Sequence, residues 1–344
     1  MTQPPRGPSR QAGPLPPPPP GRRPTRAAPR RNHRMTVVLA GVAVLLSGLV
    51  VYVAVTKGQE AQEAADKAQA AQTTPAAAAP SAPPTPATTT TGGSGAGAGG
   101  PALNGQKILK LADHPILADP DAGLKNLACD LPPWHATQQA AEAFFTAAGK
   151  CLDAAWGPFL EYYHLPFHPP ALHFPTGPNF QTDCGTIKVG IATAAYYCEN
   201  NLFVPFKGLQ TDQYGDNPGV YLALFAHEYG HHVQEVAGLM DAAWQQIYAV
   251  GQNSPAGLEM ARRKELQAQC FSGMFLGAHV DRGGSVTRDM YDKAWKDQET
   301  RGDNTSGSHD HGTNAHYAQW WRTGAQDNRI AQCNTFAAPS TDVS

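Results

Sequence analysis

Apolar residues are distributed very unevenly along this 344-residue chain, and their distribution divides it into four parts. Residues 1–34 contain almost no large apolar side chain, residues 35–55 form an uncharged and mostly apolar run, and residues 56–102 are again poor in such side chains. From about Leu103 the composition is that of a globular protein, and the remaining length of roughly 240 residues is enough for one domain with its own core. We therefore expect a tail, a membrane span, a spacer and one folded domain over residues 103–344.

The apolar run over residues 35–55 is 21 residues long and carries no charge. As a helix with a rise of about 1.5 Å per residue it would span roughly 30 Å, the thickness of a bilayer core. A cleaved signal peptide is the alternative, but its apolar region is typically about 7–15 residues long and begins earlier in the chain. Eight arginines precede the run. The positive-inside rule then predicts a single-pass cell-membrane protein with a cytoplasmic N-terminus and an extracytoplasmic C-terminal domain.

The segments on either side of this span lack the composition of a folded core. Residues 1–34 are rich in Pro, Gly and Arg and are expected to be disordered. Residues 56–102 begin as a possible stalk and continue as an Ala/Pro/Thr-rich and then Gly-rich flexible linker. With the eight arginines of the tail removed, 18 of the 26 basic residues remain against 28 acidic ones, a balance of about −10. This charge argues against a nucleic-acid partner for the exported part.

Within residues 103–344 the periodicity of apolar positions predicts mostly helices. Helical spacing covers residues 137–163, 222–239, 240–250, 256–279, 286–300 and 313–323. Residues 186–206 have the alternation of a strand, a turn and a second strand, whereas residues 164–178 and 302–312 are expected to be irregular. The predicted fold class is therefore α+β, mainly helical with a small β part. An exposed strand edge in that part could bind an extended peptide.

All six cysteines fall in the globular part, at positions 129, 151, 184, 198, 270 and 333. An even number in an exported domain indicates disulfide bonds formed in an oxidising compartment. A cysteine-based zinc cluster is the alternative, but the chain contains no C-x-x-C pair. Proximity in sequence favours the pairs 129–151, 184–198 and 270–333.

The predicted helix over residues 222–239 carries the pattern His227-Glu228-x-x-His231. Positions i and i+4 lie on the same helix face, so both imidazoles can bind one metal ion, and Glu228 can accept a proton from water activated by that ion. Zn²⁺ is the expected metal, because it favours imidazole ligands and a catalytic site with three protein ligands. The other interpretation is the polar face of an ordinary helix. The apolar neighbours of the motif argue against it, because buried ionisable groups without partners are costly.

Two histidines leave such a site one ligand short. The solution with Gly at position 234 and His at position 237 is excluded, because Gln234 and Ala237 occupy these positions. Glu265, in an apolar stretch of the helix predicted over residues 256–279, is the expected third ligand. Glu259 is the rival, but the neighbouring basic residues 262–264 suggest an exposed face. His311, in the polar loop, is a candidate for stabilising an oxyanion or binding substrate, although its presence could simply reflect the polarity of a loop.

Four segments occur in the order HEYGHHVQ, ELQAQCFSG, HGTNAHYAQWWRTG and QCNTF, and together they resemble the neutral zinc metallopeptidases of bacteria. The resemblance covers most of residues 103–336. It implies a zinc-dependent peptidase with a thermolysin-like, zincin-type core. It also implies zinc ligation by His227, His231 and Glu265, with Glu228 as the base.

The chain departs from the family pattern at two places. Gln269 stands where the pattern ELQADC has an acid, and an amide can accept the hydrogen bond of a ligand histidine but lacks the charge that raises its basicity. We therefore expect zinc to bind, with lower affinity and uncertain activity. His316 and Tyr317 replace a Gln-Arg pair, which suggests a different substrate specificity.

Together these features predict a membrane-anchored zinc endopeptidase that acts on a peptide or protein substrate outside the cytoplasm. Two alternatives share the metal site. One is a catalytically silent zinc-binding scaffold or binding module at the cell surface. The other is a metal-dependent amide hydrolase of cell-wall material.

Overall fold

The computed structural model of the chain describes residues 105–190 and 193–344. The predicted tail, membrane span and linker, residues 1–102, lie outside the described residues, so those predictions stay predictions. Among the described residues, no helix is both long and apolar enough to cross a membrane.

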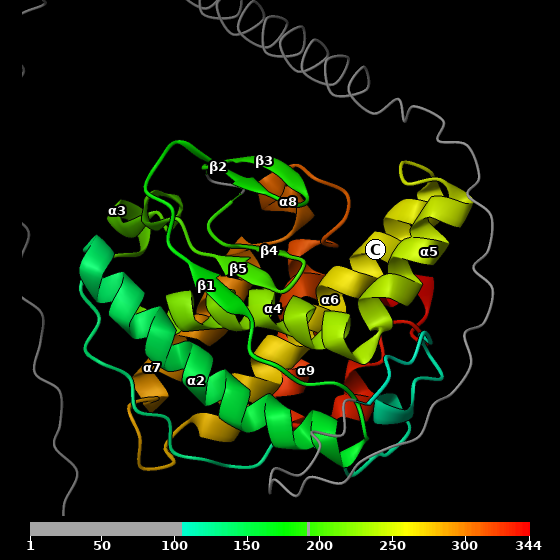
Figure 1. Cartoon of the computed structure of the whole chain (residues 1–344), viewed down its shortest axis with the longest axis horizontal. Coiled ribbons are helices and arrows are strands. Elements are labelled where there is room, and N and C mark those ends of the chain that lie inside the picture. Colours follow the sequence, from blue (N-terminus) through cyan, green and yellow to red (C-terminus); the bar gives the residue numbers. More distant parts are fainter. Residues whose placement is uncertain (1–104, 191–192) are drawn as a thin grey trace, which may run out of the picture. The chain divides into compact units, whose positions relative to one another are not determined.

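Helices make up most of the regular secondary structure of the described residues, and two small sheets accompany them (Figure 1). The helices are α2 (Gln138–Tyr162), α3 (Thr211–Tyr214), α4 (Pro218–Ala237), α5 (Leu239–Val250), α6 (Pro255–His279), α7 (Arg288–Asp297), α8 (Asp303–Ser306) and α9 (Asn314–Asp327). The strands are β1 (Ala171–His173), β2 (Asn179–Thr182), β3 (Gly185–Lys188), β4 (Tyr196–Cys198) and β5 (Asn201–Phe203). Single 3-10 turns are η1 (Pro115–Leu117), η2 (Phe206–Gly208), η3 (Gln298–Thr300), η4 (Ile330–Cys333) and η5 (Ser340–Asp342). The α+β prediction, mainly helical with a small β part, is therefore confirmed at this level.

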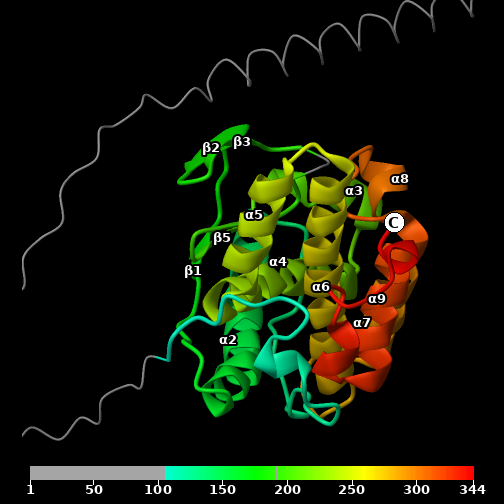
Figure 2. The same cartoon turned by 90° about the vertical axis from the view of Figure 1, so that its right-hand side faces the viewer.

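Helix α6 lies at the centre of the helical layer, where it packs against α4, α5 and α9 (Figure 2). The reason is visible in its sequence, because from residue 263 to residue 276 every side chain is buried and the helix has no solvent-facing stripe. Ser254 caps its first turn by accepting a hydrogen bond from the Gly257 N–H. A shared core joins α6 to its neighbours and includes the fully buried rings of Phe225, Phe271, Trp156 and Trp321.

The two sheets are small and of different kinds. In the three-stranded sheet, ordered β1-β5-β4, β1 runs parallel to β5 and β4 runs antiparallel to it. The second sheet is the β2-β3 hairpin. The predicted strand, turn and second strand are confirmed by the antiparallel β4-β5 hairpin, but the β prediction was wrong in two other respects. β1 lies in the segment expected to be irregular, and the segment predicted to form one hairpin contributes β3 to one sheet and β4 and β5 to the other. The pairing of β1 with β5 joins residues 171–173 to residues 201–203, and local alternation could not reveal it.

Two helical predictions near the C-terminus also need correction. The loop expected over residues 302–312 contains the single turn α8, which lies between Gly302 and Gly307, both with positive φ. Helix α9 continues beyond the predicted end at Thr323 to Asp327, because Gly324 and its neighbours pack closely on α6 at Cys270. In the second case tertiary packing extends the helix beyond its predicted end.

All three predicted disulfide pairs are confirmed: Cys129–Cys151, Cys184–Cys198 and Cys270–Cys333. The first joins the segment before α2 to α2 itself. The second joins the β2-β3 hairpin to β4, and the third joins α6 to η4.

Candidate metal centre

The packing of α4 on α6 brings three of the predicted site residues together. His227 and His231 lie one turn apart on α4, and Glu265 reaches them from α6. The Oε2 atom of Glu265 lies 3.4 Å from His227 Nε2 and 2.9 Å from His231 Nε2. One ligand atom from each residue falls within a cluster 4.8 Å across, and all three residues are buried.

A chain of hydrogen bonds fixes the tautomer of His227. The backbone carbonyl of Ala294 can only accept, so Gln298 must direct its amide nitrogen to it and its amide oxygen toward Gln269. Gln269 then donates its own nitrogen to Gln298 and presents its oxygen to His227 Nδ1 at 2.9 Å. His227 Nδ1 therefore carries the proton, and Nε2 has a free lone pair.

A second and separate chain does the same for His231. Gln234 donates its amide nitrogen to the backbone carbonyl of Lys264 and to the side-chain oxygen of Gln267, which in turn donates to the carbonyl of Cys333. The oxygen of Gln234 is left to accept from His231 Nδ1 at 2.9 Å. The lone pair of His231 Nε2 therefore also faces Glu265.

The three converging atoms, His227 Nε2, His231 Nε2 and Glu265 Oε2, are thus all electron-pair donors. Neither of the two hydrogen-bond chains, which we call relays, places a proton of His227 or His231 between these atoms. Such a group is stable when a cation binds it, since buried acceptors without a donor are costly. Two imidazole nitrogens and one carboxylate oxygen, with the outer imidazole nitrogens held by hydrogen bonds, match the ligand set that zinc uses in catalytic sites. The residues of this chain therefore fit a zinc ion.

The carboxylates of the cluster have opposite pKa shifts. Burial acts to raise the pKa of Glu265, but the neighbouring His231, Lys264 and His311 outweigh it and hold this pKa well below its ordinary value. Burial raises the pKa of Glu228, and the charge of Glu265 adds to that effect. Glu228 lies next to His227 on α4 and remains partly accessible to solvent. A carboxylate of raised pKa next to a metal site suits a group that accepts and returns protons.

His311 also lies beside the cluster, with Nε2 3.6 Å from Glu265 Oε2. Its Nδ1 lies 2.7 Å from Asp310 Oδ1, and its side chain is 35% exposed. Burial lowers the pKa of His311, but the carboxylates of Glu265 and Asp310 raise it to about 9. His311 therefore lies beside the cluster with Nε2 toward Glu265 and Nδ1 bound to Asp310.

Two aromatic residues near the cluster were not among the predicted site residues. The buried ring of Tyr317 on α9 lies 5.9 Å from the His227 ring and 6.4 Å from the His311 ring, centre to centre. Tyr196 on β4 lies close enough that the charges of Glu228 and Glu265 add to the effect of burial in raising its pKa. The departure from the family pattern at Tyr317 was a usable signal, whereas Tyr196 comes near the site only through the sheet.

The basic segment beside the third candidate ligand was misinterpreted in the sequence. Arg263 and Lys264 were expected on an exposed face, yet both are buried. Arg263 binds the rival ligand Glu259 at 2.7 Å, and Glu259 takes no part in the cluster. His232 lies on α4 beside His231 but takes a structural role. Its ring nitrogens bind the carbonyl of His168 and the hydroxyl of Tyr197.

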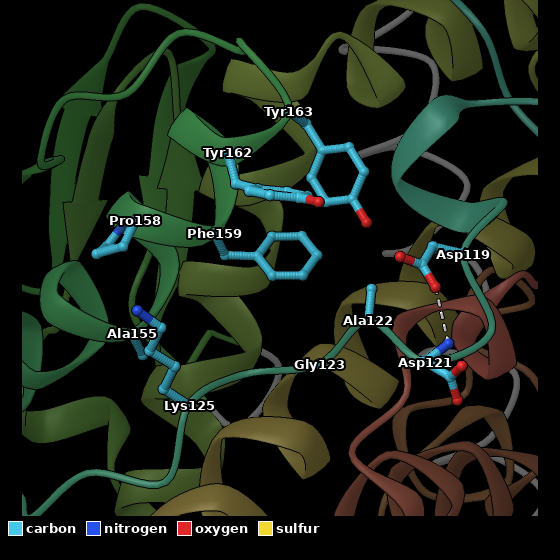
Figure 3. A pocket seen from close by; sticks show the side chains of 10 residues that line it. All are labelled: Asp119, Asp121, Ala122, Gly123, Lys125, Ala155, Pro158, Phe159, Tyr162 and Tyr163. Atoms are coloured by element: carbon cyan, nitrogen blue, oxygen red, sulfur yellow. Dashed lines mark hydrogen bonds between the residues drawn. The ribbon is translucent and has the colours of Figure 1, made fainter.

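A separate cavity of about 340 Å³ lies between the end of α2 and the loop at residues 119–125 (Figure 3). Its lining includes the aromatic residues Phe159, Tyr162 and Tyr163 and the carboxylates of Asp119 and Asp121. None of the predicted site residues lines it, and it contains no imidazole. The candidate chemistry therefore belongs to the cluster between α4 and α6 and not to this cavity.

Comparisons with known proteins agree with the chemistry of the cluster. The family described as "Putative neutral zinc metallopeptidase" matches residues 135–336. An uncharacterized protein of Mycobacterium tuberculosis is 27% identical over 222 residues, covering 56% of this chain and 69% of that protein. The uncharacterized protein YpfJ of Escherichia coli is 32% identical over 122 residues, covering 33% of this chain and 42% of that protein. No solved structure gives a significant match. Since the family match spans more than half of the chain, this protein belongs to the neutral zinc metallopeptidase family.

Proposed function

We propose that this chain is a zinc-dependent endopeptidase with His227, His231 and Glu265 as the metal ligands and Glu228 as the catalytic base. The observation that carries the proposal is the convergence of three electron-pair donors, two imidazole Nε2 atoms and one carboxylate oxygen. Both imidazoles hold their proton on Nδ1, because the amide oxygen of a glutamine accepts a hydrogen bond there. The family membership supports a zinc peptidase in general. The assignment of each residue rests on the geometry.

When bound, zinc supplies a Lewis acid that polarises the scissile carbonyl and lowers the pKa of water. Glu228 accepts the proton of the attacking water and passes it to the leaving amine. His311 faces the cluster as a proton donor and stabilises the negative charge that develops on the carbonyl oxygen. A cation at Glu265 weakens the effect of that carboxylate on His311, whereas the contact with Asp310 remains.

The edge of β4 is the proposed place for an extended substrate. β4 pairs with β5 on one side and with no other described strand on its second side. It also contacts α4, and Tyr196 lies near both carboxylates of the site. Main-chain hydrogen bonds to this edge would align a peptide beside the cluster. From the sequence alone, we further propose that residues 35–55 anchor the domain outside the cytoplasmic membrane.

The test compares zinc content and peptide hydrolysis in three variants. Glu228→Gln should keep about one zinc per chain and lose turnover, because the base is gone while the ligands remain. Glu265→Gln should lose zinc. Glu259→Gln, the matched control on the same helix, should keep both zinc and turnover. Turnover by the Glu228→Gln variant would end the proposal. A zinc-loaded wild type that cleaves no peptide would favour the binding module or, if wall fragments are cleaved, the amide hydrolase.

A further inference from the structure

Lys264 is a buried lysine directly beside a candidate zinc ligand. Its side chain is 10% exposed, and its Nζ lies 2.5 Å from Glu265 Oε1. Neighbouring positions on a helix point in different directions, so the lysine stem must bend back to reach the next residue. Trp244 on α5 supports this path, since the ammonium lies 5.2 Å from the centre of its indole ring. A long, flexible side chain is held in one conformation by burial, an ion pair and an aromatic ring.

The two oxygens of Glu265 therefore have different partners. Oε1 binds the Lys264 ammonium, whereas Oε2 faces the lone pairs of His227 and His231. A carboxylate can bind a metal through one oxygen or through both. An ammonium on Oε1 competes with binding through both, because that oxygen already accepts a short charge-assisted hydrogen bond.

We propose that Lys264 is a positioning residue that restricts Glu265 to ligation through Oε2 alone. The inference rests on the proposed function in taking Glu265 as a zinc ligand. Ligation through one oxygen keeps the site at three protein ligand atoms and leaves room for water and for the substrate carbonyl. Lys264 also balances the charge of a buried carboxylate in the metal-free protein, where an unpaired charge is costly.

Removal of the side chain would leave the rest of the centre in place. The backbone carbonyl of Lys264, and not its side chain, accepts the hydrogen bond from Gln234 that directs His231. Lys264→Met therefore keeps both histidine relays and most of the packing on Trp244 while it removes the ammonium. This separation makes the substitution a specific test of the contact with Glu265.

The experiment uses Lys264→Met, Glu265→Gln and the double variant in the full chain, with Lys293→Met as the control. Lys293 pairs with Asp289 on the surface of α7, and loss of such a pair should change little. With chelator present, Lys264→Met should lower Tm by about 5–10 °C, because a buried carboxylate loses the ammonium that contacts its Oε1. In the Glu265→Gln background the same change should cost much less, since no charge remains to balance. An equal loss in both backgrounds would mean that Lys264 only packs and would overturn the inference.

The second readout is the visible spectrum of the cobalt(II)-loaded protein, which reports the coordination number of the metal. Wild type and Lys293→Met should give the intense absorption of a four-coordinate ion. Lys264→Met should lose intensity, because both oxygens of Glu265 then bind. An unchanged spectrum would overturn the inference and leave the proposed function intact. If wild type takes up no metal, the proposed function fails, while the Tm comparison still tests the contact between Lys264 and Glu265.

Discussion

At the residue scale, the chemistry of the centre depends on two glutamines whose amide orientation is decided by backbone carbonyls. Gln269 accepts from His227 and Gln234 accepts from His231, each at 2.9 Å. Gln269 replaces an acid of the family pattern, and the sequence suggested a weakened site. The structure shows that the amide makes the hydrogen bond expected of that acid, although it carries no charge.

Replacement of Gln269 should therefore weaken zinc binding and not abolish it. We expect Gln269→Leu to lower zinc affinity about 10–100-fold, because the proton on His227 Nδ1 then has no acceptor and the imidazole loses its orientation. The measurement is a competition titration against a chelator of known affinity. Gln269→Glu, which is of similar size and restores a charge, should bind zinc at least as tightly as wild type. Unchanged affinity in Gln269→Leu would contradict the relay.

At the scale of elements, the centre depends on how closely α4 approaches α6. Gly230 marks this close approach. A Cβ at this position would lie 2.8 Å from the carbonyl oxygen of Ala268 and 3.0 Å from its Cα. His227 and His231 belong to α4, and Glu265 belongs to α6. The spacing of the two helices therefore sets the distance between the ligands.

Substitution of Gly230 by alanine should disturb both stability and metal binding. The added methyl group must push α4 and α6 apart, at a cost of about 1–3 kcal/mol that exceeds the gain in helix propensity of roughly 1 kcal/mol. Thermal unfolding and zinc titration measure the two effects. Gly190→Ala is the matched control, because a Cβ there meets nothing within 4 Å. Equal behaviour of the two variants would show that the helices can separate without consequence.

At the scale of the whole molecule, the disulfides join segments that the helical core alone does not fix. Cys270 follows Gln269 directly on α6 and is bonded to Cys333, which is 63 positions further along the chain. The carbonyl of Cys333 also ends the relay that begins at His231. The C-terminal segment is therefore part of the support of the metal centre.

Loss of this cross-link should destabilise the domain strongly. For a closed loop of this length, we expect Cys270→Ala with Cys333→Ala to lower the free energy of unfolding by about 4 kcal/mol, because the unfolded chain gains conformational freedom. Thermal unfolding of the double variant should show a lower Tm than the oxidised wild type. Wild type held in strong reductant should move in the same direction. A Tm that is the same with and without this cross-link would contradict the prediction.

The sequence by itself determined the features that depend on local pattern. Spacing along one helix was enough to place His227 and His231 on one face, and apolar periodicity was enough to predict the main helices and the α+β class. Proximity in sequence was enough to predict the three disulfide pairs. The histidine pair and the helices depend on a regular repeat, whereas the disulfide pairs follow the order of the cysteines along the chain, even where 63 positions separate Cys270 from Cys333.

Only the tertiary structure decided the features that join distant segments. It brought Glu265 and His311 to the histidines, placed β1 beside β5, and buried Lys264, which the sequence suggested was exposed. Local sequence does not encode these contacts, because they depend on which faces of separate elements meet. The tautomers of His227 and His231 were also decided by contacts between distant segments. Backbone carbonyls 67 and 33 positions away along the chain, at Ala294 for His227 and at Lys264 for His231, decide which nitrogen atoms can bind a metal.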